Sequence, residues 1–75
     1  MLDLERNNEI LQKIAAKLRL LRRKAVLLQK TVSAETGLNM GHLEGARKNV
    51  TLTTLERLCE YYNITLDEFF KDIDI

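Results

Sequence analysis

The longest amphipathic pattern of the chain runs from Leu4 to Lys24. Its apolar positions follow one another at spacings of three, four or seven residues, with arginine and lysine between them. Such spacing places the apolar side chains on one face of a helix. These positions are Leu4, Leu11, Ile14, Leu18 and Leu21. We therefore predict one long N-terminal helix whose apolar face packs against another element.

The same pattern can also be continued beyond Lys24 as a heptad repeat. One heptad position then holds Leu4, Leu11, Leu18, Ala25 and Val32, and the other holds Asn7, Ile14, Leu21 and Leu28. Sustained heptads are typical of coiled coils. Two interpretations remain open at this point: a continuous helix that pairs with another chain, or a helix that ends between Ala25 and Leu28.

Glycines mark the middle of the chain. Gly37 closes a second helical segment, because glycine adopts the left-handed conformation that ends many helices. A third helix is predicted over Leu38–Arg47, although its two glycines, Gly41 and Gly45, each cost about 1 kcal/mol of helix stability relative to alanine. Residues 48–50 form a short polar connection.

Capping patterns predict two further helices. Thr51 or Thr53 can cap the fourth helix, and Thr53 has capping-box spacing to Glu56. The apolar face of this helix consists of Leu52, Leu55, Leu58, Cys59 and Tyr62. Asn63 is suited to end it, and a capping box formed by Thr65 and Glu68 opens a last helix with Phe69 and Phe70. The pattern predicts an all-α fold, a compact five-helix domain over residues 1–75.

The composition agrees with one helical domain and also bears on where in the cell the protein is found. The chain has 75 residues, no proline and three glycines. No apolar run reaches the roughly 20 residues of a membrane span, and the N-terminus lacks the layout of a secretory signal. The single cysteine, Cys59, cannot form an intrachain disulfide, and its spacing favours a core position. We expect a cytoplasmic protein.

Catalytic and metal-binding patterns are not found in the sequence. His42 is the only histidine, and neither a metal motif nor a catalytic pairing with Cys59 accompanies it. The acidic residues near the C-terminus lack the ordered spacing of a calcium loop. We therefore expect no enzymatic activity, no metal and no cofactor.

Charge is distributed unevenly along the chain. Residues 1–30 hold eight lysines and arginines against three acidic residues, whereas residues 51–75 hold two against six. The net charge of the whole chain is only +1. A polyanion would therefore bind the N-terminal half rather than the C-terminal half.

Several segments, in this order, resemble the phage repressor and Cro type of helix-turn-helix regulator, also called the xenobiotic-response-element family. Residues 18–22 (LRLLR) resemble its I-R-x-L-R stretch, and residues 27–33 (LLQKTVS) resemble the L-S-Q-x-x-L-A opening of helix 2. Residues 35–39 (ETGLN) resemble its E-x-T-G-V-S turn. The segments 47–59 and 63–70 resemble its fourth helix and its ending. The resemblance implies a lambda-repressor-like fold and a DNA-binding regulator of transcription.

The resemblance also implies roles for individual residues. Asn39, Met40 and His42 would face base edges, and Glu44 would either add a contact or only cap the helix. Phosphates would be held by Arg22, Gln29, Lys30, Arg47, Lys48 and Asn49. A two-fold homodimer is expected, because one short recognition helix offers too few contacts for discrimination. Its interface would include Leu66, Phe69, Phe70 and Ile73, although Phe69 could instead close the domain core.

Three features depart from the family pattern. Val26 stands where a turn glycine is common, and Leu28 stands where a capping serine or threonine is common. About three residues are also missing between Gly37 and Arg47, and Gly41 and Gly45 lie inside the expected recognition helix. The missing turn glycine and the two helix glycines favour an alternative function, a helical protein–protein interaction module or coiled-coil dimer that does not bind DNA.

Overall fold

The computed structural model describes residues 4–47 and 49–73, with side chains described from Asn8 onward. Within these residues the chain forms five helices and no strand, so the prediction of an all-α fold with five helices is confirmed. In chain order they are α1 (Leu4–Lys24), α2 (Gln29–Thr36), α3 (Met40–Glu44), α4 (Leu52–Tyr61) and α5 (Leu66–Lys71).

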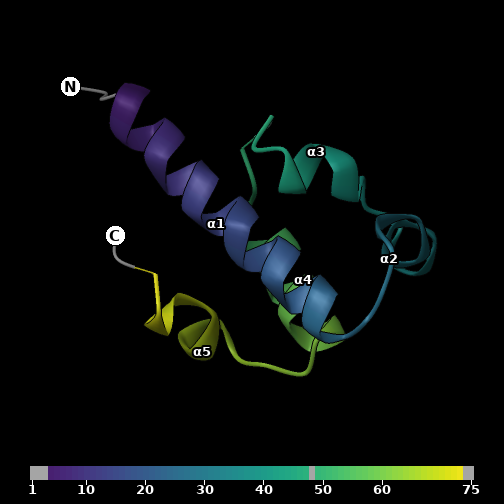
Figure 1. The fold of residues 1–75 in the computed structure, drawn as a ribbon. Coiled ribbons are helices and arrows are strands. Elements are labelled where there is room, and N and C mark those ends of the chain that lie inside the picture. The colour runs from purple at the N-terminus through teal and green to yellow at the C-terminus, as the bar shows by residue number, and fades with distance from the viewer. Residues whose placement is uncertain (1–3, 48, 74–75) are drawn as a thin grey trace.

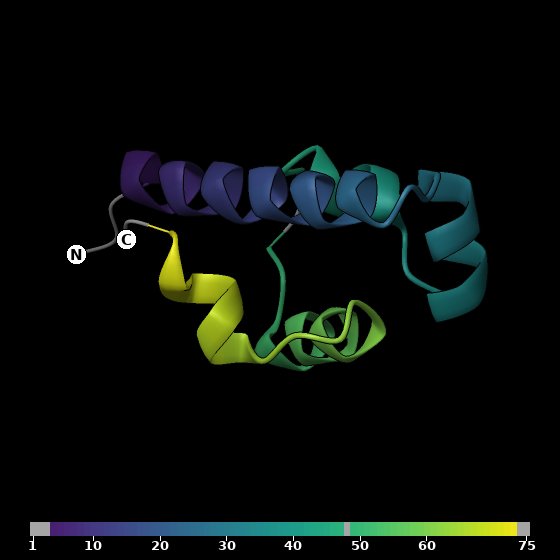
Figure 2. The ribbon, with the colours of Figure 1, turned by 60° about the horizontal axis from the view of Figure 1, so that its bottom comes forward.

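The long helix α1 organises the fold (Figure 1). In Figure 2 it runs along one side of the molecule, with α4 and α5 facing it from below and α2 beyond its C-terminal end. The short helix α3 lies beside the C-terminal half of α1 and also contacts α2. Together, α2 and α3 therefore form a unit at one end of α1.

The turn after α1 decides between the two interpretations of the heptad pattern. The helix ends at Lys24, and Val26 adopts a left-handed conformation with φ 56°. The backbone N–H of Leu27 donates to the carbonyl of Arg22 at 3.1 Å, which is the closing bond of a Schellman motif. The prediction of a break between Ala25 and Leu28 is confirmed, and the continuous helix is wrong.

The apolar face of α1 packs inside its own domain. All five helices contribute to a single core, which consists of Ile14, Leu18, Val32, Met40, Leu55, Leu58, Cys59 and Phe69. Ile14 and Leu18, two of the heptad residues, are buried there, whereas Leu28 is 68% exposed. A coiled coil through this heptad would require the core to open.

Helix α3 is shorter than the predicted span Leu38–Arg47. Asn39 begins it as an extended N-cap, and Gly45 ends it after five helical residues. Ala46 then turns the chain with φ 55°. A Cβ at residue 45 would approach the carbonyl oxygen of Gly41 to 2.9 Å, so glycine is required at this close approach. The helix therefore ends at Gly45, after little more than one turn.

The caps of the last two helices agree with the sequence in most details. Thr51, rather than Thr53, caps α4, because its Oγ1 accepts the N–H of Thr54 at 3.1 Å. Thr65 and Glu68 form the predicted capping box at the start of α5. Asn63 adopts the expected left-handed conformation, with φ 60°. No helix within the described residues has both the length and the apolar character to cross a membrane.

Candidate nucleic-acid interface

Three residues, Gly37 to Asn39, connect α2 to α3 and fix the angle between the two helices. Gly37 has φ 76°, and its N–H donates to the carbonyl of Ser33 at 2.9 Å. The hydroxyl of Ser33 in turn accepts the N–H of Met40 at 3.1 Å. The side chain of Leu38 packs against the core between them. This arrangement is a helix-turn-helix, in which α3 occupies the position of the recognition helix.

Asn39 is the N-cap of α3. Its Oδ1 accepts the backbone N–H of His42 at 3.1 Å, which satisfies one of the donors that a helix leaves free at its start. The residue itself remains exposed. Its carboxamide is therefore ordered at the surface before any ligand binds.

The C-terminal end of α3 is fastened by Glu44. This residue is only 2% exposed, and its carboxylate accepts hydrogen bonds from Arg22 Nε at 2.8 Å and from Gln29 Nε2 at 3.1 Å. Arg19 donates to the backbone carbonyl of Glu44. The carboxylate therefore links α3 to both α1 and α2, since Arg22 belongs to α1 and Gln29 to α2.

Arg22 is held within the domain as well. Its Nη1 donates to the carbonyl of Leu27 at 2.9 Å, and its side chain is 13% exposed. The hydrogen bond with Glu44 raises the pKa of Arg22 further above neutrality, while burial opposes that rise. The guanidinium therefore holds the carboxylate and the turn, and the contact of Arg22 with a phosphate stays a prediction.

Tyr62 adds a polar group close to this ion pair. Its hydroxyl oxygen is buried and has no hydrogen-bond partner within the described residues. Burial raises the pKa of Tyr62 above its ordinary value, and the negative charge of Glu44 raises it further. The hydroxyl therefore stays protonated at neutral pH.

Two other predicted contacts are placed differently by the structure. Met40 is 0% exposed and belongs to the core, so the prediction that it faces a base is wrong. Gln29 was expected to donate to a phosphate, but its Nε2 donates to Glu44 instead. Gln29 Nε2 is therefore engaged by the same carboxylate that holds Arg22.

The remaining predicted DNA contacts lie at the surface. Lys30, Asn39, Arg47 and Asn49 are exposed, and His42 is half-buried. Lys30 lies in the first turn of α2, while Arg47 and Asn49 follow α3. Lys48 lies outside the described residues. The exposed cations are therefore found both before and after α3 in the chain.

The structural roles of Glu44 and Arg19 were missed by sequence reasoning. A signal for Glu44 was present, because it follows Met40 by four residues and so shares its helix face. A charged residue on a buried face requires a partner. Arg19 and Arg22 lie one turn apart on α1 and are the partners it finds.

The predicted dimer residues divide into one core residue and three surface residues. Phe69 is fully buried in the domain core, so its assignment to an interface between copies is wrong. Leu66, Phe70 and Ile73 are half-buried and pack against the edge of the core. A hollow beside Ile73 is also lined by Leu20 of α1, which is 45% exposed. An ion pair between Lys17 and Asp72, at 3.6 Å, joins the two sides of this hollow.

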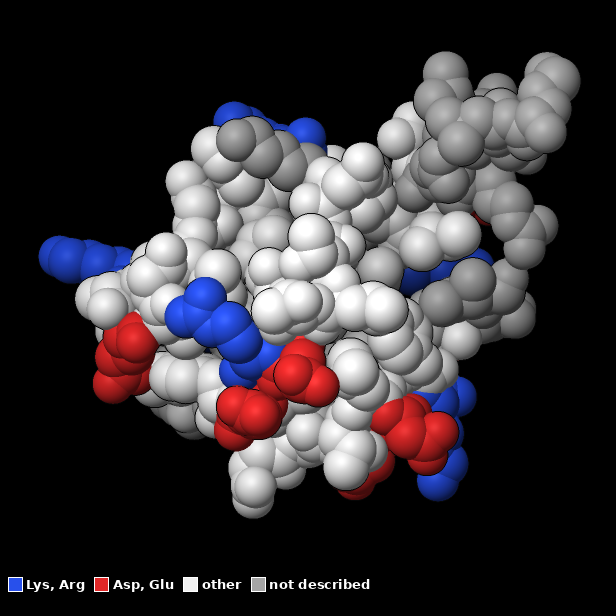
Figure 3. Space-filling model, turned by 180° about the vertical axis from the view of Figure 1, so that it is seen from behind, with Lys and Arg blue, Asp and Glu red and all other residues white. Residues whose placement is uncertain are grey.

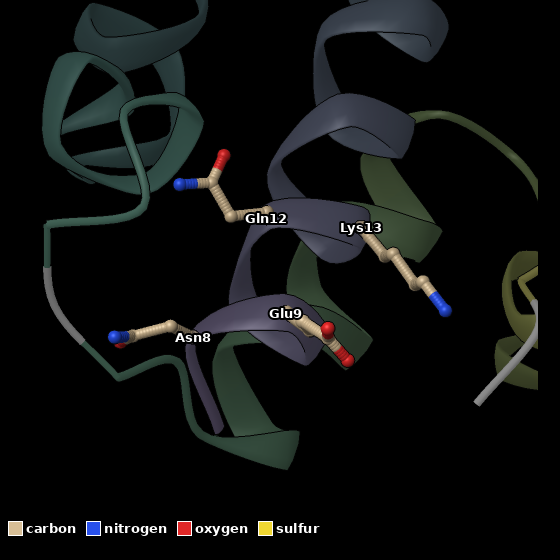
Figure 4. A pocket seen from close by; sticks show the side chains of 4 residues that line it. All are labelled: Asn8, Glu9, Gln12 and Lys13. Atoms are coloured by element: carbon tan, nitrogen blue, oxygen red, sulfur yellow. The ribbon is translucent and has the colours of Figure 1, made fainter. Parts of the chain in front are cut away.

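Seen from behind, acidic and basic side chains are interspersed (Figure 3). A hollow beside α1 is lined by Asn8, Glu9, Gln12 and Lys13, but Asn8 and Gln12 point away from Glu9 and Lys13 (Figure 4). Ligand sites depend on polar groups that converge. Within the described residues, no cluster of histidine, cysteine and acidic residues could hold a metal ion.

Comparison with known proteins identifies the family. Residues 11–74 match the family model of the Cro/C1-type HTH DNA-binding domain. The match includes most of α1 and all of the helix-turn-helix formed by α2 and α3. No match was found among curated proteins or solved structures. The chain therefore belongs to the Cro/C1-type helix-turn-helix family of DNA-binding domains.

Proposed function

We propose that this protein is a sequence-specific regulator of transcription, rather than an enzyme, and that it binds double-stranded DNA in the cytoplasm as a homodimer. The observation that carries this proposal is the two-sided character of α3. Its inner face consists of Met40 and Glu44, which are buried, while Asn39 and His42 present polar groups at the surface. A helix of this kind is suited to enter the major groove and read base edges.

Phosphate contacts are proposed on both sides of α3. Lys30 lies at the start of α2, where Leu28 provides no side-chain cap, so the first N–H groups of the helix are available to an anion. Arg47 and Asn49 follow α3, and Lys48 lies between them in the sequence. Contacts before and after the recognition helix would hold it in register on the duplex.

Selection from random DNA tests this function. The full chain is incubated with a library of random duplexes, and the bound fraction is enriched and sequenced. We expect a two-fold symmetric consensus whose half-sites are separated by about one helical turn, because two copies present two recognition helices. Equal affinity for the enriched and the starting library would contradict sequence-specific binding.

The homodimer is proposed from the apolar surface formed by α1 and the C-terminal segment. Leu66, Phe70 and Ile73 are only partly covered by their own domain, and Leu20 continues this surface on α1. One recognition helix of five residues provides few base contacts. Two copies on one operator would double them, which is the usual route to useful specificity.

A further inference from the structure

Two residues in the turn between α1 and α2 are unfavourable for the local backbone and gain nothing inside the domain. Val26 adopts the left-handed conformation, with φ 56°, which is costly for a β-branched residue. Leu28 is the N-cap of α2 but forms no side-chain cap. Their side chains are 88% and 68% exposed, so burial in the core offsets neither loss. Two apolar side chains are therefore kept at the surface at a cost to the stability of the fold.

A hollow of about 500 Å³ lies beside this turn, between the end of α1 and the end of α4. Val26 and Leu28 each directly follow a residue of its wall in the chain. We call Val26, Leu28 and this hollow the turn patch. The wall of the hollow is mostly apolar and includes Leu21, Lys24, Ala25, Leu27, Tyr61 and Tyr62.

The aromatic part of the wall is ordered by contacts within the domain. The rings of Tyr61 and Tyr62 pack edge to face, with their centroids 5.2 Å apart. The hydroxyl of Tyr61 donates to the carboxylate of Glu35, and the hydroxyl oxygen of Tyr62 is buried. The rings are therefore the groups left for contact with a partner. A wall that is already ordered lowers the entropic cost of binding an apolar side chain.

The charge around the turn patch is of one sign over a long stretch of the chain. Residues 10–34 contain seven lysines and arginines and no aspartate or glutamate. Among the described residues that line the hollow, Lys24 alone is charged. Arg23, at the end of α1, and Lys30, in the first turn of α2, are also exposed. An apolar surface with basic neighbours is complementary to a partner that carries carboxylates.

We propose that the turn patch is a docking surface for an acidic segment of another protein. An apolar side chain of this segment enters the hollow, its neighbours contact Val26 and Leu28, and a flanking carboxylate pairs with Lys24. The unfavourable residues of the turn are then offset by contacts made only in the complex. The concave shape suits an inserted side chain, which neither a duplex nor a lipid bilayer provides.

Docking at the turn patch excludes DNA, a consequence that rests on the proposed function. Leu28 is the N-cap of α2, and the first N–H groups of that helix are the proposed phosphate site. A segment that covers Leu28 also covers these groups, and its carboxylates pair with Lys30 in place of a phosphate. The partner is thus an inhibitor of DNA binding that never contacts α3.

Selection from a displayed library of random peptides tests the docking surface. The full chain is the bait, and the double variant Val26→Gly/Leu28→Ser is the counter-bait. Glycine suits the left-handed backbone and serine can cap α2, so the double variant remains folded. We expect enrichment of peptides in which a leucine or an aromatic residue is flanked by aspartate or glutamate. No enrichment relative to the double variant overturns the proposal.

An enriched peptide, labelled with fluorescein and measured without DNA, tests the side chains one by one. Leu28→Ser should weaken binding at least about tenfold, because an apolar contact is lost while the fold is kept. Leu52→Ser, the same change at a leucine that is 69% exposed on α4, should change it less than about twofold. Equal affinities of these two variants would overturn the docking surface.

The charge contribution is measured with the same peptide. Lys24→Gln should weaken binding at least about fivefold at low salt and less at high salt, because screening reduces the attraction. Lys71→Gln, which removes an exposed cation from α5, should leave the affinity unchanged. Binding that is insensitive to both Lys24→Gln and salt overturns the acidic character of the partner.

Two further measurements distinguish other occupants and the link to DNA. Vesicles of phosphatidylcholine and phosphatidylserine should not retain the protein, and retention that Val26→Gly abolishes would assign the turn patch to a membrane instead. The peptide should displace the selected operator, and a complex that contains both would overturn the exclusion of DNA. A protein that binds no duplex contradicts the proposed function alone, because the peptide measurements contain no DNA and decide the docking surface by themselves.

Discussion

Arg22 Nε lies 2.8 Å from Oε2 of Glu44 in the interior of the domain. The carboxylate of this pair is almost completely removed from water, and the bond crosses from α1 to α3. Burial of one charge without the other is costly, because the remaining ion loses its hydration without compensation. The position of the recognition helix and the stability of the fold therefore depend on the same contact.

Removal of the carboxylate should strongly destabilise the domain. We expect Glu44→Ala to lower the free energy of unfolding by about 3–5 kcal/mol, because Arg22 is left buried and unpaired. Urea titration followed by circular dichroism measures this change. Glu56→Ala, at an exposed glutamate of α4, serves as the control and should stay within about 0.5 kcal/mol. Similar losses in the two variants would show that the ion pair has no structural role.

Val26 provides a position where substitution should stabilise the protein. Its left-handed backbone costs a residue with a Cβ about 1–2 kcal/mol, and its side chain gains little from burial because it is 88% exposed. We expect Val26→Gly to unfold at a higher temperature than Val26→Ala. The alanine variant keeps a Cβ in the strained conformation and therefore isolates the backbone effect. An equal melting temperature for the two variants would contradict this explanation.

Leu28 is a second such position. It is the N-cap of α2, with an extended backbone (φ −89°, ψ 150°), but it forms no side-chain cap. Leu28→Ser should add a hydrogen bond to the first turn and raise the free energy of unfolding by about 1 kcal/mol relative to Leu28→Ala. Thermal unfolding of both variants measures the difference. A serine variant no more stable than the alanine variant would indicate that the cap does not form.

Arg47 should contribute to DNA affinity without contributing to sequence preference. In Arg47→Ala, the slope of log K against log salt concentration should fall by about one unit, because one fewer counterion is released. The loss should be the same for selected and random duplexes, as fluorescence anisotropy can show. Lys71→Ala, which removes an exposed cation from α5, should leave the slope unchanged. A loss confined to the selected operator would instead assign Arg47 to base reading.

Leu20 tests the proposed homodimer without disturbing the core. A charge at this position should shift sedimentation toward the monomer, since Leu20 lies beside Ile73 on the proposed interface. Leu20→Glu is preferable to a change at Phe70, whose ring packs edge-on against the core ring of Phe69. Leu52→Glu, at another exposed leucine, is the control. If Leu20→Glu sediments like the unaltered chain, α1 is not part of the interface.

Much of the fold could be predicted because it depends on local signals. Three such signals each depend on only a few neighbouring residues and appear where the sequence predicts them. They are the capping box of Thr65 and Glu68, the left-handed Asn63 and the Gly37 that ends α2. The end of α1 was harder to predict, because Val26 is an unfavourable residue for a left-handed turn. Its position was indicated only by the family resemblance.

The candidate site was predicted less well because it depends on contacts between distant segments. Arg22 and Gln29 are residue types that often bind phosphates. Only the fold reveals that both donate hydrogen bonds to Glu44. Met40 was placed on the wrong face because the direction of a five-residue helix depends on its packing rather than on its own periodicity. Charge and spacing in the sequence indicate which residues are polar, but not which polar groups form hydrogen bonds with each other.

The division of α3 into an inner and an outer face has a consequence for how this protein can evolve. Met40 and Glu44 anchor the helix, whereas Asn39, Gly41 and His42 are free of the core. If α3 reads DNA as proposed, substitutions at the outer positions would change the preferred sequence while the anchors remain, provided that residue 39 still caps the helix. New specificities are then accessible through single mutations that cost little stability, and a regulator and its operator can diverge together without passing through an unfolded intermediate.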